Sequence, residues 1–127
     1  MNVIIGHGID IIEIARVREM IERHADRFVE RVFTPAEAAY ARDHVDPFPR
    51  FAARFAAKEA ALKVIGTGWR DGIAWTDVEV RLLPSGAPFL HVTGKAAEIA
   101  AGLGIVRWHV SLSHSRELAT ASVIGEA

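Results

Sequence analysis

The chain has 127 residues, the length of one ordinary domain, and half of its residues are hydrophobic while 24% are charged. A formal net charge of -1 argues against a surface devoted to nucleic acid, and the absence of cysteine excludes disulfides, a thiol nucleophile and a thiolate zinc site. With no apolar run long enough for a bilayer and no signal-type start, we expect a single cytoplasmic domain over residues 1–127, away from membranes.

The first half of the chain predicts one strand followed by helices. The β-branched run at 3–12 contains glycines, which indicates a close backbone approach or a bulge before Asp10. A capping-box pattern starts at Thr34, and Gly66 ends a long alanine-rich stretch. The predicted elements are a strand at 3–12, a helix from 14 with a break near 24–26, a short helix at 35–43 and an alanine-rich helix at 50–65.

The second half predicts two hairpins and one more helix. Val78, Val80 and Leu82 alternate with Asp77, Glu79 and Arg81, which predicts a half-buried strand with the first set facing the core and the second facing solvent. A Pro- and Gly-containing turn after it indicates that the first two strands form a hairpin. The predicted elements are strands at 76–83 and 89–92, a helix at 94–103, and strands at 106–113 and 118–124. This order predicts an α+β fold, with an antiparallel-rich sheet packed on the long alanine-rich helix.

The alanine-rich helix carries the most informative charged residues. Glu59 and Lys63 lie one turn apart, and Phe55 lies one turn before Glu59, so a carboxylate is expected among aromatic side chains. An ordinary Glu59–Lys63 ion pair on the helix surface explains the same spacing. The helical wheel points Arg54 and Lys58 away from Glu59.

Asp10 is an acid inside an apolar, β-branched run. It could introduce the following helix as its N-cap, or it could approach Glu59 in the folded chain. Two carboxylates beside Lys63 and the glycines after the helix would suit Mg²⁺ bridging a pyrophosphate, because Mg²⁺ is typically held by one or two carboxylates plus phosphates.

Two other patterns admit ordinary explanations. The segment 109–116 is rich in Ser and His, but no nucleophile elbow surrounds its serines, so a phosphate- or ribose-contacting turn is favoured over a hydrolase. On the first helix, Arg16, Met20, Arg23 and Arg27 form a basic stripe. The stripe predicts an acidic partner helix or, alternatively, a solvated face paired with neighbouring glutamates.

Four segments, taken together, resemble the holo-acyl-carrier-protein synthases, a family of small 4'-phosphopantetheinyl transferases. The resemblance covers essentially the whole chain, from about residue 4 to 124. The segments are Gly8-Ile9-Asp10-Ile11 with Glu13 and Arg16; Phe33-Thr34-Pro35 with Glu37; Arg54-Phe55-Ala56-Ala57-Lys58-Glu59-Ala60 with Lys63 and Gly66-Thr67-Gly68; and Val110-Ser111-Leu112-Ser113-His114-Ser115. The stretches 43–50 and 69–75 match no pattern.

The resemblance implies transfer of the 4'-phosphopantetheine group of coenzyme A to a serine of apo acyl carrier protein, giving the holo protein and adenosine 3',5'-bisphosphate. It implies Asp10 and Glu59 as ligands of Mg²⁺ or Mn²⁺, and Lys63 on the attacked phosphate; these three are the expected catalytic residues. Glu59, or a metal-bound water that it holds, would accept the serine proton. The implied coenzyme A site comprises Arg54, Lys63, Gly66, Pro88, His114 and Ser115.

The resemblance also implies partners. Acidic carrier protein would dock on Arg16, Met20, Arg27 and Phe28, and three copies would form a homotrimer with active sites between protomers. Whether the carrier serves fatty-acid or polyketide synthesis stays open. The alternatives are a homologue that binds coenzyme A or an acidic helix without transfer, and a magnesium-dependent phosphohydrolase that uses the same carboxylates.

Overall fold

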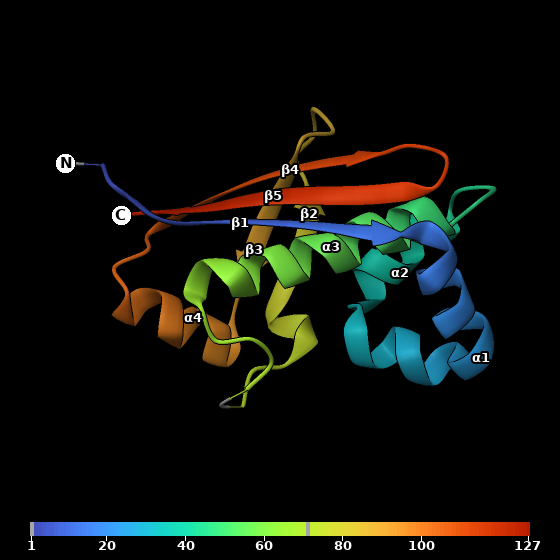
Figure 1. The fold of residues 1–127 in the computed structure, drawn as a ribbon, viewed down its shortest axis with the longest axis horizontal. Helices are drawn as coiled ribbons and strands as arrows, with labels where there is room; N and C mark the ends of the chain where they lie inside the picture. Colours follow the sequence, from blue (N-terminus) through green and yellow to red (C-terminus); the bar gives the residue numbers. More distant parts are fainter. Residues whose placement is uncertain (1, 71) are drawn as a thin grey trace.

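The computed structural model describes residues 2–70 and 72–127 (Figure 1). Its helices and strands follow the predicted order closely. In chain order they are β1 (Ile4–Glu13), α1 (Ile14–Val32), α2 (Pro35–Arg42), α3 (Phe48–Ile65), the 3-10 helix η1 (Trp75–Asp77), β2 (Val78–Leu82), β3 (Pro88–Val92), α4 (Gly94–Gly102), β4 (Arg107–His114) and β5 (Leu118–Glu126). The described part of the chain contains no helix long and apolar enough to span a bilayer.

The strands form two antiparallel sheets. The larger sheet has the order β1-β5-β4, so the first strand of the chain pairs with the last one, and the smaller sheet is the predicted hairpin of β2 and β3. Helix α3 runs along one face of the larger sheet, with the hairpin behind it, as Figure 1 shows. The predicted α+β arrangement of an antiparallel sheet on an alanine-rich helix is therefore confirmed.

Small residues let α3 lie close to the sheet. Its buried face consists largely of alanines that are at most 4% exposed: Ala52, Ala53, Ala56, Ala57, Ala60 and Ala61. On the sheet side, a Cβ at Gly8 would overlap the carbonyl oxygen of Ala60. The close backbone approach predicted from the glycines of β1 is thus present, while the register irregularity lies earlier in the strand, between Ile4 and Gly6.

Helix α1 contains the predicted break. Ala25 adopts φ 47° and ψ -131°, outside the helical region, so the helix is two segments joined at a kink. Left-handed φ values are uncommon for residues other than glycine. Residues 14–24 and 26–32 therefore do not share one continuous face, and Arg27 and Phe28 lie beyond the kink from Arg16.

The prediction of a strand at 76–83 was wrong in two respects: where the strand begins, and which of its side chains are buried. Residues 75–77 form η1, because the Asp77 carboxylate accepts hydrogen bonds from the backbone N–H groups of Ala74 and Ala96. Glu79, expected to face solvent, is 8% exposed, and Leu82, expected to face the core, is 37% exposed. A polar partner draws Glu79 inward: the Thr34 hydroxyl donates to its carboxylate.

Candidate functional site

Lys63, near the end of α3, contacts the first strand. Its Nζ donates to the Ile9 carbonyl oxygen at 2.7 Å and lies 3.3 Å from Oδ1 of Asp10. The Asp10 side chain is 19% exposed, whereas that of Lys63 is 54% exposed. The long cationic side chain therefore reaches a carboxylate that the backbone has already placed against α3.

These contacts decide between two of the alternatives from the sequence. Asp10 is not an N-cap, because Glu13 holds that position for α1 and makes no side-chain capping bond. Within the described residues, Lys63 pairs with Asp10 and not with Glu59. The carboxylate of Glu59 instead accepts a hydrogen bond from the indole N–H of Trp69, with 3.3 Å between Nε1 and Oε1.

Glu59 and Lys63 line a cavity of about 310 Å³, called here the Lys63 pocket, together with Leu62, Gly66 and Gly68. Gly66 ends α3 in the left-handed conformation, with φ 74°. A side chain at such a position would be strained, and glycine lets the chain turn away from the helix end. The turn leaves the cavity open beside both charged groups.

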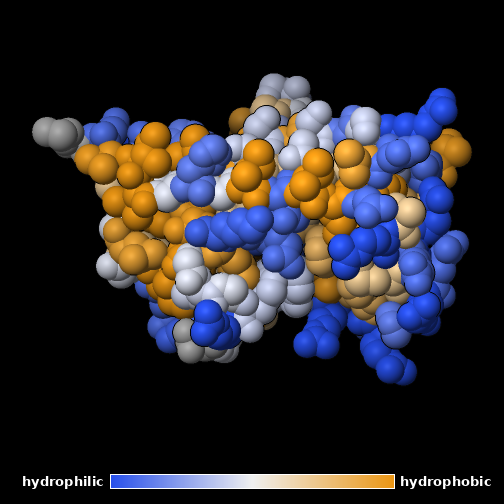
Figure 2. Space-filling view, viewed as in Figure 1, coloured by the Kyte–Doolittle hydropathy of each residue, from blue (hydrophilic) through white to orange (hydrophobic). Residues whose placement is uncertain are grey.

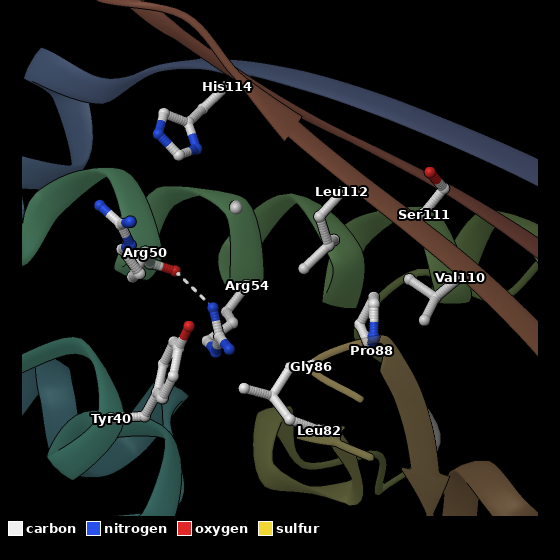
Figure 3. A pocket seen from close by; sticks show the side chains of 11 residues that line it. Tyr40, Arg50, Arg54, Leu82, Gly86, Pro88, Val110, Ser111, Leu112 and His114 are labelled. Carbon is white, nitrogen blue, oxygen red and sulfur yellow. Dashed lines mark hydrogen bonds between the residues drawn. The ribbon is translucent and has the colours of Figure 1, made fainter. Parts of the chain in front are cut away.

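A second cavity lies further back along α3 and is called here the Arg54 pocket. It has a volume of about 300 Å³, and Figure 3 shows its lining residues, which come from α2, α3, the hairpin of β2 and β3, and β4. The polar side chains around it are those of Tyr40, Arg50, Arg54 and His114, whereas the Ser111 hydroxyl points away from the cavity, and the hairpin contributes Leu82, Gly86 and Pro88. The abundance of cationic and hydroxyl groups suits a phosphate-bearing ligand.

Arg54 is the most buried charge in this pocket, at 4% exposed. Its guanidinium lies 4.3 Å from the centre of the Tyr40 ring, and its Nε is buried without a hydrogen-bond partner among the described residues. Burial lowers the pKa of Arg54 from its ordinary value. A buried guanidinium that lines a cavity is well placed to bind an anion through its terminal N–H groups.

The structure divides the predicted coenzyme A residues between the two cavities. Arg54, Pro88 and His114 line the Arg54 pocket, whereas Lys63 and Gly66 line the Lys63 pocket. Along a helix rising 1.5 Å per residue, Arg54 and Lys63 are about 14 Å apart. The helical wheel had already separated Arg54 from Glu59, and the structure agrees.

Ser115, the remaining predicted coenzyme A residue, closes the turn between β4 and β5. Its backbone N–H donates to the Leu118 carbonyl, and its hydroxyl accepts from the Leu118 N–H.

The sequence did not point to Tyr40 or Arg50 in the Arg54 pocket. Arg50 lies one turn before Arg54, a spacing that could have suggested a shared face, but Tyr40 comes from α2 and no local signal connects it to α3.

The kink in α1 divides the residues predicted to bind the carrier protein: Arg16 and Met20 lie before it, and Arg27 and Phe28 lie after it. Arg16 and Met20 line a small cavity with Glu19, Arg23 and His24. Within it, Arg23 forms an ion pair with Glu19 at 2.9 Å, as the solvated-face alternative expects. Beyond the kink, the exposed Arg27 is followed by Phe28, whose ring packs inward on Phe33 and Phe55.

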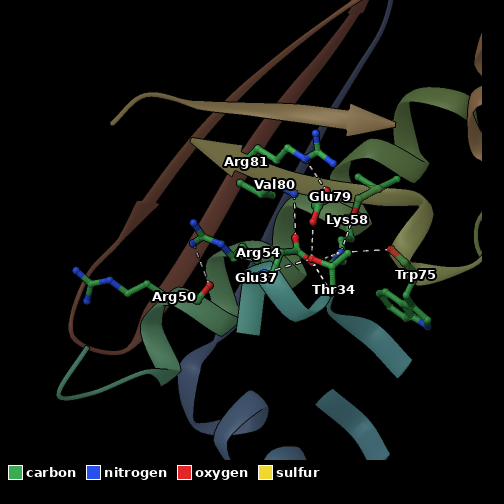
Figure 4. Close-up of polar contacts among 10 residues, drawn as sticks. Thr34, Glu37, Arg50, Arg54, Lys58, Trp75, Glu79, Val80 and Arg81 are labelled. Carbon is green, nitrogen blue, oxygen red and sulfur yellow. Dashed lines mark hydrogen bonds and ion pairs between the residues drawn. The ribbon is translucent and has the colours of Figure 1, made fainter. Parts of the chain in front are cut away.

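A buried polar cluster behind the Arg54 pocket was also absent from the sequence predictions (Figure 4). Glu37 accepts hydrogen bonds from Lys58 Nζ at 2.8 Å, from the Thr34 N–H and from the Val80 N–H. The side chains of Glu37 and Lys58 are fully buried, and burial lowers the pKa of Lys58 despite its acidic partner. The cluster ties α2, α3 and β2 together, and these elements contribute Tyr40, Arg54 and Leu82 to the wall of the Arg54 pocket.

Comparisons with known proteins show the family to which the chain belongs. The model of the 4'-phosphopantetheinyl transferase superfamily matches residues 6–121. Because that match covers most of the chain, the chain belongs to this superfamily. Within it, the similarity is to holo-[acyl-carrier-protein] synthases: that of Koribacter versatilis is 52% identical over 123 residues, 97% of this chain and 98% of the relative.

Solved structures show the same likeness. The holo-[acyl-carrier-protein] synthase of Neisseria meningitidis has a TM-score of 0.88 and 29% identity, covering 98% of this chain and all of that one. The Helicobacter pylori synthase, solved in complex with coenzyme A, has a TM-score of 0.82 and 28% identity over 94% of this chain and 98% of its own. The family and the fold predicted from the sequence are confirmed.

Proposed function

We propose that the chain transfers the 4'-phosphopantetheine group of coenzyme A to a serine of apo acyl carrier protein and releases adenosine 3',5'-bisphosphate. The relatives named as holo-[acyl-carrier-protein] synthases support this transfer, as does the relative bound to coenzyme A. The observation that carries the proposal is the contact of Lys63 with Asp10, one helical turn from Glu59, beside an open cavity. It joins residues far apart in the sequence into one cluster of opposite charges.

Asp10 and Glu59 would hold the divalent cation, Mg²⁺ or Mn²⁺. Both present hard carboxylate oxygens, and the described residues contain no cluster of three or more acidic, His or Cys side chains that could enclose a metal. Such a sparse ligand set fits a cation that completes its shell with water and substrate phosphate. When bound, the cation would neutralise charge on the pyrophosphate.

The proposed reaction is a displacement at phosphorus. The serine oxygen of the carrier protein forms a bond to the phosphorus that bears the pantetheine arm, and the bond to the bridging pyrophosphate oxygen breaks. The two electrons of the broken bond leave with adenosine 3',5'-bisphosphate, and the serine proton passes to Glu59. Lys63 contributes a positive charge beside the attacked phosphate, so positioning and electrostatics lower the barrier.

The homotrimer belongs to the same proposal. The family resemblance implies active sites between protomers, and a complete coenzyme A site would then combine the Lys63 pocket of one protomer with the Arg54 pocket of the next. An apolar surface is present to support assembly: Ile5, Ile9 and Ile11 of β1 are 38%, 61% and 63% exposed. Figure 2 shows hydrophobic residues following the course of β1, with hydrophilic ones between them.

The acyl carrier protein would bind on α1 through Arg16 and Arg27, with Met20 contributing apolar contact. Exposed arginines of this kind mainly accelerate encounter with an acidic partner. The expected setting is fatty-acid or polyketide synthesis in the cytoplasm.

Mass spectrometry of an apo carrier protein tests the transfer. After incubation with this chain, coenzyme A and Mg²⁺, we expect a gain of about 340 Da, the mass of the arm added in a metal-assisted transfer. A chelator should prevent the gain, and Glu59→Gln should reduce it at least about 100-fold. Binding of coenzyme A without any mass gain would contradict the proposal and identify a non-catalytic homologue; release of free phosphopantetheine without carrier protein would identify a hydrolase.

A further inference from the structure

The loop after α3 brings an indole to the carboxylate of Glu59. Trp69 lies in the stretch 69–75 for which the sequence provided no pattern, and its Nε1 donates to Oε1 of Glu59 at 3.3 Å. Trp69 therefore contacts a residue to which the proposed reaction assigns both metal binding and proton transfer.

An aromatic stack holds this indole in place. The ring of Trp69 stacks on Trp75, with 3.7 Å between centroids and 29° between planes. Trp75 in turn stacks on Phe55 at 5.1 Å and 27°. Phe55 lies one turn before Glu59 on α3, so the stack anchors the donor to the same helix that carries its acceptor.

The geometry suits a supporting role. An ionised carboxylate has about four acceptor sites, so one N–H on Oε1 leaves Oε2 and a further lone pair of Oε1 available. A hydrogen bond from a rigid ring restricts rotation of the carboxylate, as the outer partners of metal ligands commonly do. Indole donates but does not accept, so Trp69 cannot itself bind the cation.

We propose that Trp69 is a positioning residue that orients the Glu59 carboxylate toward the cation through its indole N–H. The inference rests on the proposed function, because it takes Glu59 as a cation ligand. It adds a residue of this chain that acts through Glu59 and touches no substrate.

The first test measures the affinity of the protein for Mn²⁺ alone, by electron paramagnetic resonance of the free ion. Trp69→Phe keeps a stacking ring and removes the N–H, so we expect Mn²⁺ affinity to fall about 10-fold or more. Trp75→Phe is the matched control: it makes the same change in the same stack, away from Glu59, and should leave the affinity within about 2-fold. Wild-type affinity in Trp69→Phe would overturn the inference.

The second test uses no tryptophan substitution, so it can be carried out even if Trp69→Phe fails to fold. In protein labelled with ¹⁵N-tryptophan, the indole N–H signal of Trp69 should shift in Glu59→Gln and on addition of Mg²⁺ to the wild type. The signal of Trp108, on β4, serves as the internal control and should stay in place. A Trp69 signal that is identical in wild type and Glu59→Gln would contradict the hydrogen bond.

The two tests separate this inference from the proposed function. Wild-type protein that binds no Mn²⁺ would overturn the metal site and, with it, the positioning role. Mn²⁺ binding that is lost in Glu59→Gln but unchanged in Trp69→Phe would keep the metal site and overturn the role of Trp69 alone. Loss in both variants, with Trp75→Phe unaffected, is the expected result.

Discussion

Glu37 shows how one side chain can connect several parts of the fold. Its carboxylate caps α2 through the Thr34 N–H, neutralises Lys58 and satisfies the backbone N–H of Val80 in β2. A buried charge without such partners would cost several kcal/mol. The partners of Glu37 therefore make a buried carboxylate compatible with the core.

Glu79, beside this cluster, should make stability depend on pH. Burial alone would raise the pKa of Glu79, but hydrogen bonds from Thr34 and Arg81 outweigh it and hold the pKa below the ordinary value. The stabilisation is present above the ordinary Glu pKa and is lost as pH falls through the lowered one, because the unfolded chain takes up the proton first. Glu79→Gln should therefore lose less unfolding free energy than the wild type between about pH 7 and about pH 3.

Urea unfolding at several pH values measures this difference. Glu98→Gln, an exposed change of the same kind on α4, is the control and should follow the wild-type curve. If the unfolding free energies of the wild type and of Glu79→Gln fell equally as the pH is lowered, the role of Glu79 would be contradicted.

At the residue scale, sequence reasoning found the residues whose signal is local or carried by the family resemblance. Glu59 and Lys63 share a helix, and Asp10 stands out as an acid in an apolar run. The bonds from Trp69 to Glu59 and from Lys58 to Glu37 were not predicted. Both depend on how separate elements pack, which periodicity along one segment does not report.

The contact of β1 with α3 is an element-scale feature that depends on Gly8. Gly8→Ala would push a methyl group into the Ala60 carbonyl, so β1 must move away from α3. We expect a loss of about 1–3 kcal/mol in unfolding free energy and weaker Mn²⁺ binding, because Asp10 moves with the strand. Calorimetry and an ion-binding assay measure the two effects.

The control for this prediction is Gly102→Ala at the end of α4. A Cβ there meets no atom within 4 Å, and its φ is not positive. Alanine is preferred over glycine in a helix by about 0.5–1 kcal/mol, so this variant should be as stable as the wild type or more so. Equal destabilisation by both changes would mean that the close approach at Gly8 is unimportant.

Helix α1 should select the protein substrate and not coenzyme A. Arg16 is exposed and lies before the kink, so Arg16→Ala is expected to raise the KM for acyl carrier protein several-fold at low salt, with the KM for coenzyme A little changed. The effect should shrink as salt screens the charges. Steady-state kinetics with each substrate varied in turn measures it.

Arg18→Ala provides the comparison on the same helix. Its side chain points about 200° around the helix axis from Arg16 and lies near Asp46 and Phe48. It should leave the KM for carrier protein unchanged. If Arg16→Ala raised both KM values equally, α1 would not be the docking element.

Element boundaries were predictable where capping or breaking residues mark them. Thr34 and Glu37 form the predicted capping box, and Gly66 ends α3 as expected. The start of β2 was not predictable from alternation, because the side-chain bonds of Asp77 favour a 3-10 turn over an extended strand. The kink at Ala25 was located, but the sequence offers no glycine there to indicate its left-handed φ.

At the scale of the whole molecule, the separation of the two cavities makes the proposed assembly testable by mixing variants. If a site takes Glu59 from one protomer and Arg54 from the next, inactive Glu59→Gln and Arg54→Ala proteins should form active sites together. After co-refolding at equal amounts, about a quarter of the sites in a closed ring would contain two intact halves. We therefore expect activity to recover to about a quarter of the wild-type value in the transfer assay.

The matched control mixes Glu59→Gln with Lys63→Ala. Both changes fall in the Lys63 pocket, so every site of a mixed assembly contains a damaged Lys63 pocket. Activity should therefore stay at the level of the separate variants. Failure of Glu59→Gln and Arg54→Ala to complement, in a mixture shown by light scattering to contain trimers, would mean that each site lies within a single protomer.

The order β1-β5-β4 also affects how the chain can be synthesised. Ile4 pairs with Glu126, and β5 lies between the other two strands, so the larger sheet has no central strand until β5 has been synthesised. Pairings so distant along the chain form slowly compared with helices. Until β5 has emerged, the nascent chain leaves the β5-facing edge of β1 and the part of α3 that β5 covers exposed, and chaperones are the natural protection during this interval.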